Sequence, residues 1–250
     1  EATRNAPVTN PMRSLWSPRT ILTESFRFPS LIELVRMRVI YNEVISSNEN
    51  DDSEVCDIRE LSNANNKLLI GIMGRVEAYK GHEDIIYAIS RLRDDDKNKI
   101  KMVVIGKGDP TEIERLKRIA DRLNVGSNLH FLGYLSDSSA AIIKQLDLLV
   151  VATRIFEGFG LTLAEAILED VPVLATSVGA IPEFIDDAVG RLVSSGSPKE
   201  MALAISDFIN NQKKWNEKSG KAKQRIYNIS NEMSDEYRRL FIEYHDSPKR

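Results

Sequence analysis

A chain of 250 residues, 42% of them hydrophobic and 28% charged, has the composition of an ordinary globular protein. Its formal net charge of -3 argues against a nucleic-acid-binding protein, which is usually basic. The single cysteine, Cys56, excludes a disulfide within the chain and favours a reducing compartment, and no apolar run approaches the roughly 20 residues that a membrane-spanning helix needs.

The segment before Lys67 contains little that would build a core. Residues 1–19 show no clear period, and residues 20–45 hold only short candidate strands and one short candidate helix. Residues 46–66 are polar, acidic and rich in Asn and Ser, so we interpret them as a linker. We therefore expect the main domain to begin at Lys67.

Short apolar runs recur from Lys67 onward. Each run is typical of a strand that is buried on both faces of a parallel sheet. The runs are Leu68–Met73, Met102–Ile105, Leu148–Ala152 and Val171–Ala175, and His130 is expected to begin another strand.

Amphipathic helices are expected between these strands. Apolar residues at helical spacing predict one helix over residues 85–92 and a second over 113–123, with Gly126 as its C-cap. Further helices are expected near the C-terminus, over residues 197–208, 217–227 and 232–244. The alternation predicts an α/β fold with a doubly wound, Rossmann-like parallel sheet over residues 67–210.

The loops that follow the strands are the candidate binding segments, because ligands of open parallel sheets lie outside the carboxyl ends of the strands. Gly74, Arg75 and Lys80 follow the first strand and offer two cations to a diphosphate. The plain alternative is two surface charges in a loop. Gly106-Lys107-Gly108 follows the second strand and is a weak indication, since tight turns need glycine anyway.

The most informative segment is Glu157–Ala166. It places two glycines before a helix, an arrangement that presents backbone N–H groups and the positive end of the helix dipole to an anion. Glu157 in the loop and Glu165 on the helix each offer two acceptor oxygens to a vicinal diol. The alternative is a solvated loop residue and a surface charge, but the apolar neighbours of Glu165 indicate partial burial and favour a role.

At these residues the sequence resembles a known family. The stretch EGFGLTLAEAILEDVPVLATSVGAIPEFI (157–185) is similar to the donor-site signature of retaining glycosyltransferase family 4, whose mark is two glutamates separated by seven residues. GRVEAYKG (74–81) resembles the phosphate loop of that family, and FLGYLSD (131–137) resembles its base-binding segment. The resemblance runs from about Lys67 to Val193 and implies the donor-binding domain of a GT-B fold.

The resemblance assigns a role to each matching residue. Arg75 and Lys80 would neutralise the diphosphate leaving group, Glu157 would hold hydroxyls of the transferred sugar, and Glu165 would hold the ribose. The other donor-binding residues would be Gly74, Gly133, Tyr134, Leu135, Gly158, Phe159, Gly160, Leu161 and Thr162, with Gly133, Tyr134 and Leu135 lining the base pocket.

Three further positions bear on the resemblance. We expect Gly71, beside the phosphate loop, to allow close approach of another domain or of the acceptor. Asp170 stands where the family often has glycine, and Ala180 follows Gly179 where a second glycine is common. These two departures alter a turn and leave the charge pattern intact.

We expect the site to work without a metal or another cofactor. The resemblance implies transfer with retention, in which cations and a helix end stabilise the diphosphate. No Asp-x-Asp occurs in a site loop, and we interpret the acidic runs Asp51-Asp52 and Asp94-Asp95-Asp96 as solvated. The paired glutamates are not interpreted as the acid and nucleophile of a glycosidase.

The resemblance also implies a second domain, for the acceptor, that is longer than residues 1–45. Residues 38–44 resemble the segment that crosses out of that domain, so we interpret residues 1–45 as its tail or a shortened version. We expect the helices of residues 211–250 to cross back toward it, which would leave Leu240 and Phe241 exposed without it. The catalytic histidine of the family belongs to the absent region, and we interpret His82 as a helix-start residue.

The sequence thus predicts a hexosyltransferase whose donor is a UDP-, GDP- or ADP-linked sugar and whose acceptor is a saccharide or a lipid-linked molecule, with no role for nucleic acid. We expect it in the cytoplasm or at the cytoplasmic face of a membrane, completed by an acceptor domain or a partner subunit. Two alternatives remain open: a non-catalytic or split nucleotide-sugar-binding subunit and, less favoured, a nucleotide-sugar epimerase.

Overall fold

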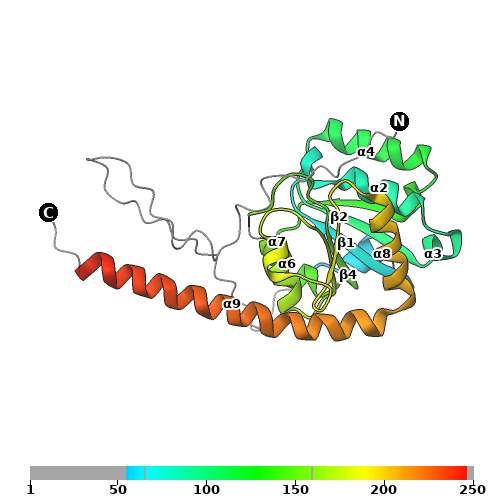
Figure 1. Ribbon diagram of the computed structural model, residues 1–250. Coiled ribbons are helices and arrows are strands. Elements are labelled where there is room, and N and C mark those ends of the chain that lie inside the picture. The colour runs from blue at the N-terminus through cyan, green and yellow to red at the C-terminus, as the bar shows by residue number, and fades with distance from the viewer. Residues whose placement is uncertain (1–54, 65, 159, 247–250) are drawn as a thin grey trace, which may run out of the picture. The chain divides into compact units, whose positions relative to one another are not determined.

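The structure, a computed structural model, describes residues 55–64, 66–158 and 160–246 (Figure 1). The predictions for residues 1–45, for residues 46–54 and 65 of the predicted linker, and for Phe159 lie outside these residues. The described chain forms one parallel sheet with the strand order β3-β2-β1-β4-β5-β6. The strands are β1 Leu68–Met73, β2 Ile100–Ile105, β3 Leu129–Gly133, β4 Leu148–Val151, β5 Val173–Thr176 and β6 Arg191–Val193. The predicted α/β class with a doubly wound parallel sheet is confirmed.

The strands form where apolar residues are contiguous. The four interior residues of β1 are buried, and Ile70 at its centre lies between Met102 of β2 and Leu148 of β4. The chain order reverses at this central pair, so β1 and β4 flank the topological switch point. β5 begins two residues later than predicted because Asp170 adopts a left-handed turn and Pro172 has no N–H to donate.

Helices cover both faces of the sheet (Figure 1). α2 (His82–Ser90) contacts α4 (Pro110–Arg122) and α8 (Pro198–Asn210), and their apolar residues join Ile70 and Ile72 of β1 in one core. α6 (Leu161–Leu168) contacts α5 (Ser139–Ile143) and α9 (Gln212–Asp246). Shorter elements are α1 Ile58–Leu61, η2 Ala78–Lys80, α3 Asp94–Asn98, η3 Gly126–Asn128 and α7 Ile181–Phe184.

Two predictions about helix ends are wrong. α4 ends before Leu123, and the left-handed residue behind it is Asn124 (φ 55°), whereas Gly126 opens the next 3-10 turn. The two polar helices expected near the C-terminus are one continuous helix, α9, of 35 residues. Its buried residues recur at helical spacing, and they are Trp215, Ser219, Ala222 and Ile226. The side chains of Leu240 and Phe241 lie outside the description, so their exposure stays a prediction.

Polar composition concealed two packed segments. Within the stretch interpreted as a linker, α1 buries Ile58 completely, and Gln145 hydrogen-bonds to its backbone N–H at 2.9 Å. The interpretation of Asp96 as solvated is also wrong, because its side chain is fully buried. Burial alone would raise the pKa of Asp96, but hydrogen bonds from Ser206, Arg93 and Lys99 outweigh it and hold that pKa below its usual range.

Gly71 makes room for a neighbouring side chain inside this domain. It lies in the interior of β1, and a Cβ atom there would clash with the side chain of Leu146, which is buried. The expectation that Gly71 admits another domain or the acceptor is therefore corrected. Within the described part of the chain, none of the helices has the length and apolar character that crossing a membrane requires.

Candidate functional site

A cleft of about 200 Å³ opens at the carboxyl ends of β1 and β4. It lies at the switch point of the sheet, where two neighbouring strands send their loops in opposite directions. Seven of the predicted site residues line this cleft, and they are Gly74, Arg75, Lys80, Glu157, Gly160, Leu161 and Thr162. Their convergence comes from the parallel topology, which brings the loops after β1 and β4 to the same edge.

An ion pair lies inside the cleft. Lys80 Nζ is 2.8 Å from Glu157 Oε2, and the two side chains are 25% and 18% exposed. Lys80 is the last residue of η2, and the next residue, Gly81, adopts a left-handed conformation (φ 75°). A side chain on Gly81 would clash with the carbonyl of Ala152 at the end of β4. The close packing of these two loops therefore places the lysine beside the glutamate.

Arg75 stands at the mouth of the cleft. Its side chain is 70% exposed, forms an ion pair with Glu77 at 2.6 Å, and donates to the hydroxyl of Tyr79 at 3.2 Å. The two predicted cations thus differ: Lys80 is enclosed and paired with the second predicted site segment, whereas Arg75 is mostly exposed and paired within its own loop.

The start of α6 faces the same cleft. Its N-cap is Gly160 (φ 72°), and no side chain caps the helix. Leu161 and Thr162, the first two helical residues, line the cleft. The backbone N–H groups at this end of the helix and the positive end of its dipole therefore face the cleft. Gly158 is exposed in the preceding loop, and Phe159 lies outside the described residues.

The remaining predicted residues do not line this cleft. Glu165 lies farther along α6 and is half-buried; burial raises the pKa of its carboxyl, and the hydroxyl of Ser139 on α5 opposes that rise. Tyr134 follows β3 and is 65% exposed, with Lys107 Nζ 4.6 Å from its ring centroid. Gly133 and Leu135, on either side of it, are half-buried. Whether these four residues belong to the same site stays a prediction.

Hydrogen bonds from Arg154 to neighbouring elements hold the start of the Glu157 loop. Arg154 forms two bonds to Asp84 of α2, at 2.6 and 2.7 Å, and its N–H donates to the carbonyl of Tyr79 at 2.7 Å. The Asp84 side chain is 5% exposed, so its carboxylate is removed from water, whereas the Arg154 side chain is 35% exposed. Sequence reasoning missed both residues, because neither belongs to a motif and they are 70 positions apart.

Gly179 holds the other end of the same loop. The N–H of Ala180 donates to the carbonyl of Glu157 at 3.1 Å, and any side chain on Gly179 (φ 54°) would clash with that carbonyl. Ala180 has an ordinary helical φ of -81°, so glycine is not needed there. Asp170, by contrast, is left-handed (φ 58°), the conformation that favours glycine. The structure thus explains why alanine is accommodated at position 180 and why glycine is common at position 170.

His82 is a buried, titratable residue of the cleft lining. It is the first residue of α2, as predicted, and is 4% exposed. Neither ring nitrogen has a hydrogen-bond partner among the described residues. Burial lowers the pKa of His82 to about 4, against the opposing effects of the Glu77 carbonyl and the Glu112 carboxylate, so the imidazole is neutral at neutral pH.

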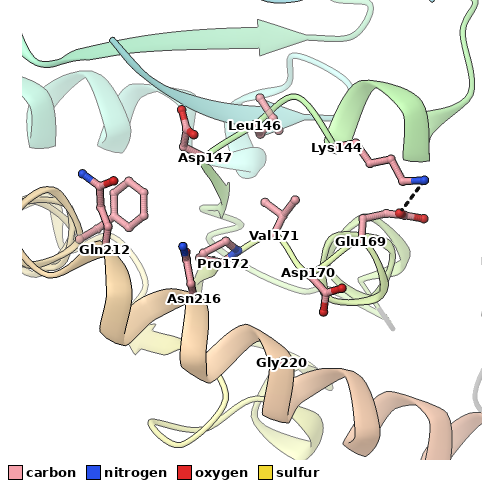
Figure 2. A pocket seen from close by; sticks show the side chains of 11 residues that line it. Lys144, Leu146, Asp147, Glu169, Asp170, Val171, Pro172, Gln212, Asn216 and Gly220 are labelled. Atoms are coloured by element: carbon pink, nitrogen blue, oxygen red, sulfur yellow. Dashed lines mark ion pairs between the residues drawn. The ribbon is translucent and has the colours of Figure 1, made fainter. Parts of the chain in front are cut away.

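A second, larger cavity of about 450 Å³ lies at the amino edge of the sheet (Figure 2). Lys144 and Glu169 point toward each other there and form an ion pair at 3.1 Å, and Asp170 pairs with Lys223 of α9 at 2.8 Å. Asp147 accepts bonds from Arg59 at 2.6 Å and from the N–H of Leu69 at 2.7 Å. The charged groups of this cavity serve to join elements of the fold to one another.

Comparison with known proteins agrees with this geometry. The family profile described as glycosyl transferases group 1 matches residues 57–226. An uncharacterized glycosyltransferase of Methanocaldococcus jannaschii is 30% identical over 58% of this chain and 37% of its own length. The D-inositol 3-phosphate glycosyltransferase of Corynebacterium glutamicum is 27% identical over 64% of this chain and 39% of its own length. The match therefore spans less than half of these relatives.

Solved structures give the same fold. HepE of Anabaena, crystallised in complex with UDP-glucose, superimposes with a TM-score of 0.64 at 23% identity, over 72% of this chain and 51% of its own. The C-terminal domain of a group 1 glycosyl transferase from Francisella tularensis superimposes with a TM-score of 0.58 at 28% identity, over 64% of this chain and 85% of its own. The predicted GT-B-type fold is thereby confirmed.

Proposed function

The chain belongs to the group 1 glycosyl transferases, and we propose that it forms the donor-binding part of a family 4 hexosyltransferase that transfers its sugar with retention. The observation that carries the proposal is the Lys80–Glu157 pair, which lies in a cleft at the switch point beside the uncapped start of α6. A cation, a carboxylate and a helix N-terminus in one cleft suit a ligand with both phosphate and hydroxyl groups.

The diphosphate would lie between Lys80, Arg75 and the start of α6. Breaking the bond between sugar and diphosphate leaves negative charge on the phosphate oxygens. Preorganised cations and helix N–H groups stabilise that charge as it develops, so they lower the barrier of the chemical step. In this scheme the side chains and the helix end supply the positive charge, and Glu157 holds hydroxyls of the transferred sugar.

The nucleoside would extend away from this cleft toward the ends of β2 and β3. Glu165 would take the ribose hydroxyls, and its half-burial strengthens such hydrogen bonds by excluding water. Tyr134, exposed and already beside a lysine, would stack on the base, with Gly133 and Leu135 completing the pocket. HepE, which has the same fold, was crystallised with UDP-glucose, so UDP is the first nucleotide to test.

The acceptor would be a saccharide or a lipid-linked molecule, and an acceptor domain or partner subunit would bring it to the cleft. The acceptor and its binding part go beyond the described domain. The segment that aligns with the curated relatives covers less than half of their length. We place the reaction in the cytoplasm or at the cytoplasmic face of a membrane, where nucleotide sugars and membrane-bound acceptors meet.

Calorimetric titration with UDP, GDP, ADP and their sugar conjugates tests the proposal. We expect one nucleotide to bind, and Lys80→Met and Glu165→Ala to weaken it about tenfold or more, since each removes a charge-assisted contact. Lys144→Met is the matched control: it removes another partly exposed lysine that is paired with a glutamate, at the amino edge. Binding of none of the ligands, or equal loss in Lys80→Met and Lys144→Met, would contradict the proposed site.

A further inference from the structure

We propose that Thr153 is a positioning residue that sets the Glu157 carboxylate and thereby controls how tightly the sugar, rather than the nucleotide, of the donor is held. The inference rests on the proposed function, because it specifies how Glu157 does its part in that site. Thr153 lines the cleft at the end of β4, and none of the motifs in the sequence includes it.

The contact itself is short and buried. Thr153 is 1% exposed, and its Oγ1 donates to Glu157 Oε2 at 3.0 Å. Lys80 Nζ donates to the same oxygen at 2.8 Å. Both donors act on Oε2, and within the described part of the chain no residue donates to Oε1. The carboxylate is therefore held by one oxygen and keeps the acceptor capacity of the other for a hydroxyl of a ligand.

Thr153 is itself fixed on both sides. The hydroxyl of Thr176 donates to its carbonyl oxygen at 2.6 Å, and the next residue, Arg154, is anchored to Asp84. A threonine also has few χ1 rotamers, because its Cβ is branched. A fixed backbone and a restricted rotamer give the hydroxyl one direction, and that direction is toward Glu157.

Lys80 is less suited to this part while a donor is bound. Its ammonium group carries the charge that attracts a diphosphate, so the ligand competes with Glu157 for it. The neutral, buried hydroxyl of Thr153 has no such competitor. When Lys80 turns to the phosphates, Thr153 is the contact that keeps Glu157 aimed at the sugar. Loss of the hydroxyl should therefore weaken binding of a nucleotide sugar and leave binding of the nucleotide unchanged.

The test compares Kd values of UDP and UDP-glucose, or of whichever nucleotide and conjugate bind the wild-type chain. We expect Thr153→Val to raise the Kd of the conjugate about tenfold, the equivalent of one hydrogen bond, and to change that of the nucleotide less than about twofold. Thr153→Ser restores the donor and should restore the affinity. Ser62→Ala is the control, because it removes a buried hydroxyl that donates to the carbonyl of Ile58, and Ser62 does not line the cleft.

Equal weakening of both ligands in Thr153→Val, no rescue by Thr153→Ser, or the same selective loss in Ser62→Ala would overturn the inference. If Thr153→Val does not fold, Thr153→Ala takes its place. A wild-type chain that binds none of the ligands contradicts the proposed function instead. The contact is then tested without ligand by urea unfolding: Thr153→Val and Glu157→Gln should be less than additive in the double variant, and additivity would exclude the coupling.

Discussion

The larger cavity of this protein, about 450 Å³, lies at the amino ends of the strands, whereas the proposed donor site occupies about 200 Å³ at their carboxyl ends. Both contain a lysine paired with a glutamate, Lys144 with Glu169 and Lys80 with Glu157. The larger volume therefore does not identify the edge that carries the site, and the charged residue types do not identify it either.

The two edges of the sheet differ in the hydrogen-bond and ion-pair partners of their polar groups. At the amino edge, Asp147 joins β1 to α1, and Asp170 joins the end of α6 to α9, so the charges are used in the fold. At the carboxyl edge, α6 begins without a side-chain cap, Arg75 is mostly exposed, and His82 has no hydrogen-bond partner among the described residues. A helix start without a cap, a buried unpartnered imidazole and an exposed cation in one cleft mark a binding site better than volume does.

Among the variants that test this comparison, Arg154→Met is expected to lower the free energy of unfolding most. It leaves the buried carboxylate of Asp84 without its cation, which typically costs about 3 to 5 kcal/mol. Urea unfolding measures this loss. Adding Asp84→Asn should recover much of it, because the buried charge is then gone. A change below about 1 kcal/mol would show that the loop is not held by this pair.

A second effect concerns acid. Because the folded pKa of His82 is about 4, below its ordinary 6.5, the unfolded chain takes up this proton first as the pH falls. The stability that neutral His82 contributes is present above pH 6.5 and is lost between pH 6.5 and 4. The loss is on the order of 3 kcal/mol.

The variant His82→Leu tests this directly. It should match the wild type at pH 7, because no hydrogen bond is lost, and it should exceed the wild type by about 2 to 3 kcal/mol near pH 4.5. Urea unfolding at the two pH values gives the difference between the proteins. If the wild type and His82→Leu lost the same stability between pH 7 and pH 4.5, His82 would not be the group whose protonation destabilises the protein.

At the amino edge, Asp147→Ala removes the acceptor of two hydrogen bonds and should lower the free energy of unfolding by about 2 kcal/mol. Because Asp147 has no part in the carboxyl-edge cleft, nucleotide affinity should stay within about twofold of the wild type. Unfolding and calorimetry on the same preparation separate the two effects. Loss of affinity in a folded variant would break the distinction between the edges.

The smallest effect is expected from Asp170→Gly. Glycine relieves the left-handed backbone at this position, but it removes the exposed ion pair with Lys223 and adds freedom to the unfolded chain. These contributions oppose one another, so the free energy of unfolding should change by less than about 0.5 kcal/mol. A loss above about 1 kcal/mol would show that the ion pair matters more than the turn.

Much of the fold was predictable because its elements are local. β1 has the predicted bounds, since a run of apolar residues ending in glycine is the property that a central parallel strand requires. β3 and β6 were harder to predict. β3 is half-buried throughout, at one side of the sheet, and β6 has only three residues, so neither shows a continuous apolar run.

The candidate site was predictable in part for a similar reason. Chain order alone places the loops after β1 and β4 at one edge, so Arg75, Lys80, Glu157 and the start of α6 were expected together. Their roles stay predictions until ligands are measured. Glu165 and Tyr134 do not line this cleft, and their part in binding the nucleoside stays a prediction.

What the sequence determined by itself is the α/β class, the central strands and the edge of the sheet that carries the site, because hydrophobic period and glycine placement are properties of neighbouring residues. Only the tertiary structure decided the pairings: Arg154 with Asp84, Thr153 and Lys80 with Glu157, and Ser206 with Asp96 across 110 positions. The physical reason is that the role of a polar side chain depends on its burial and on the residues that it contacts. Both come from packing between distant segments, which local sequence patterns do not record.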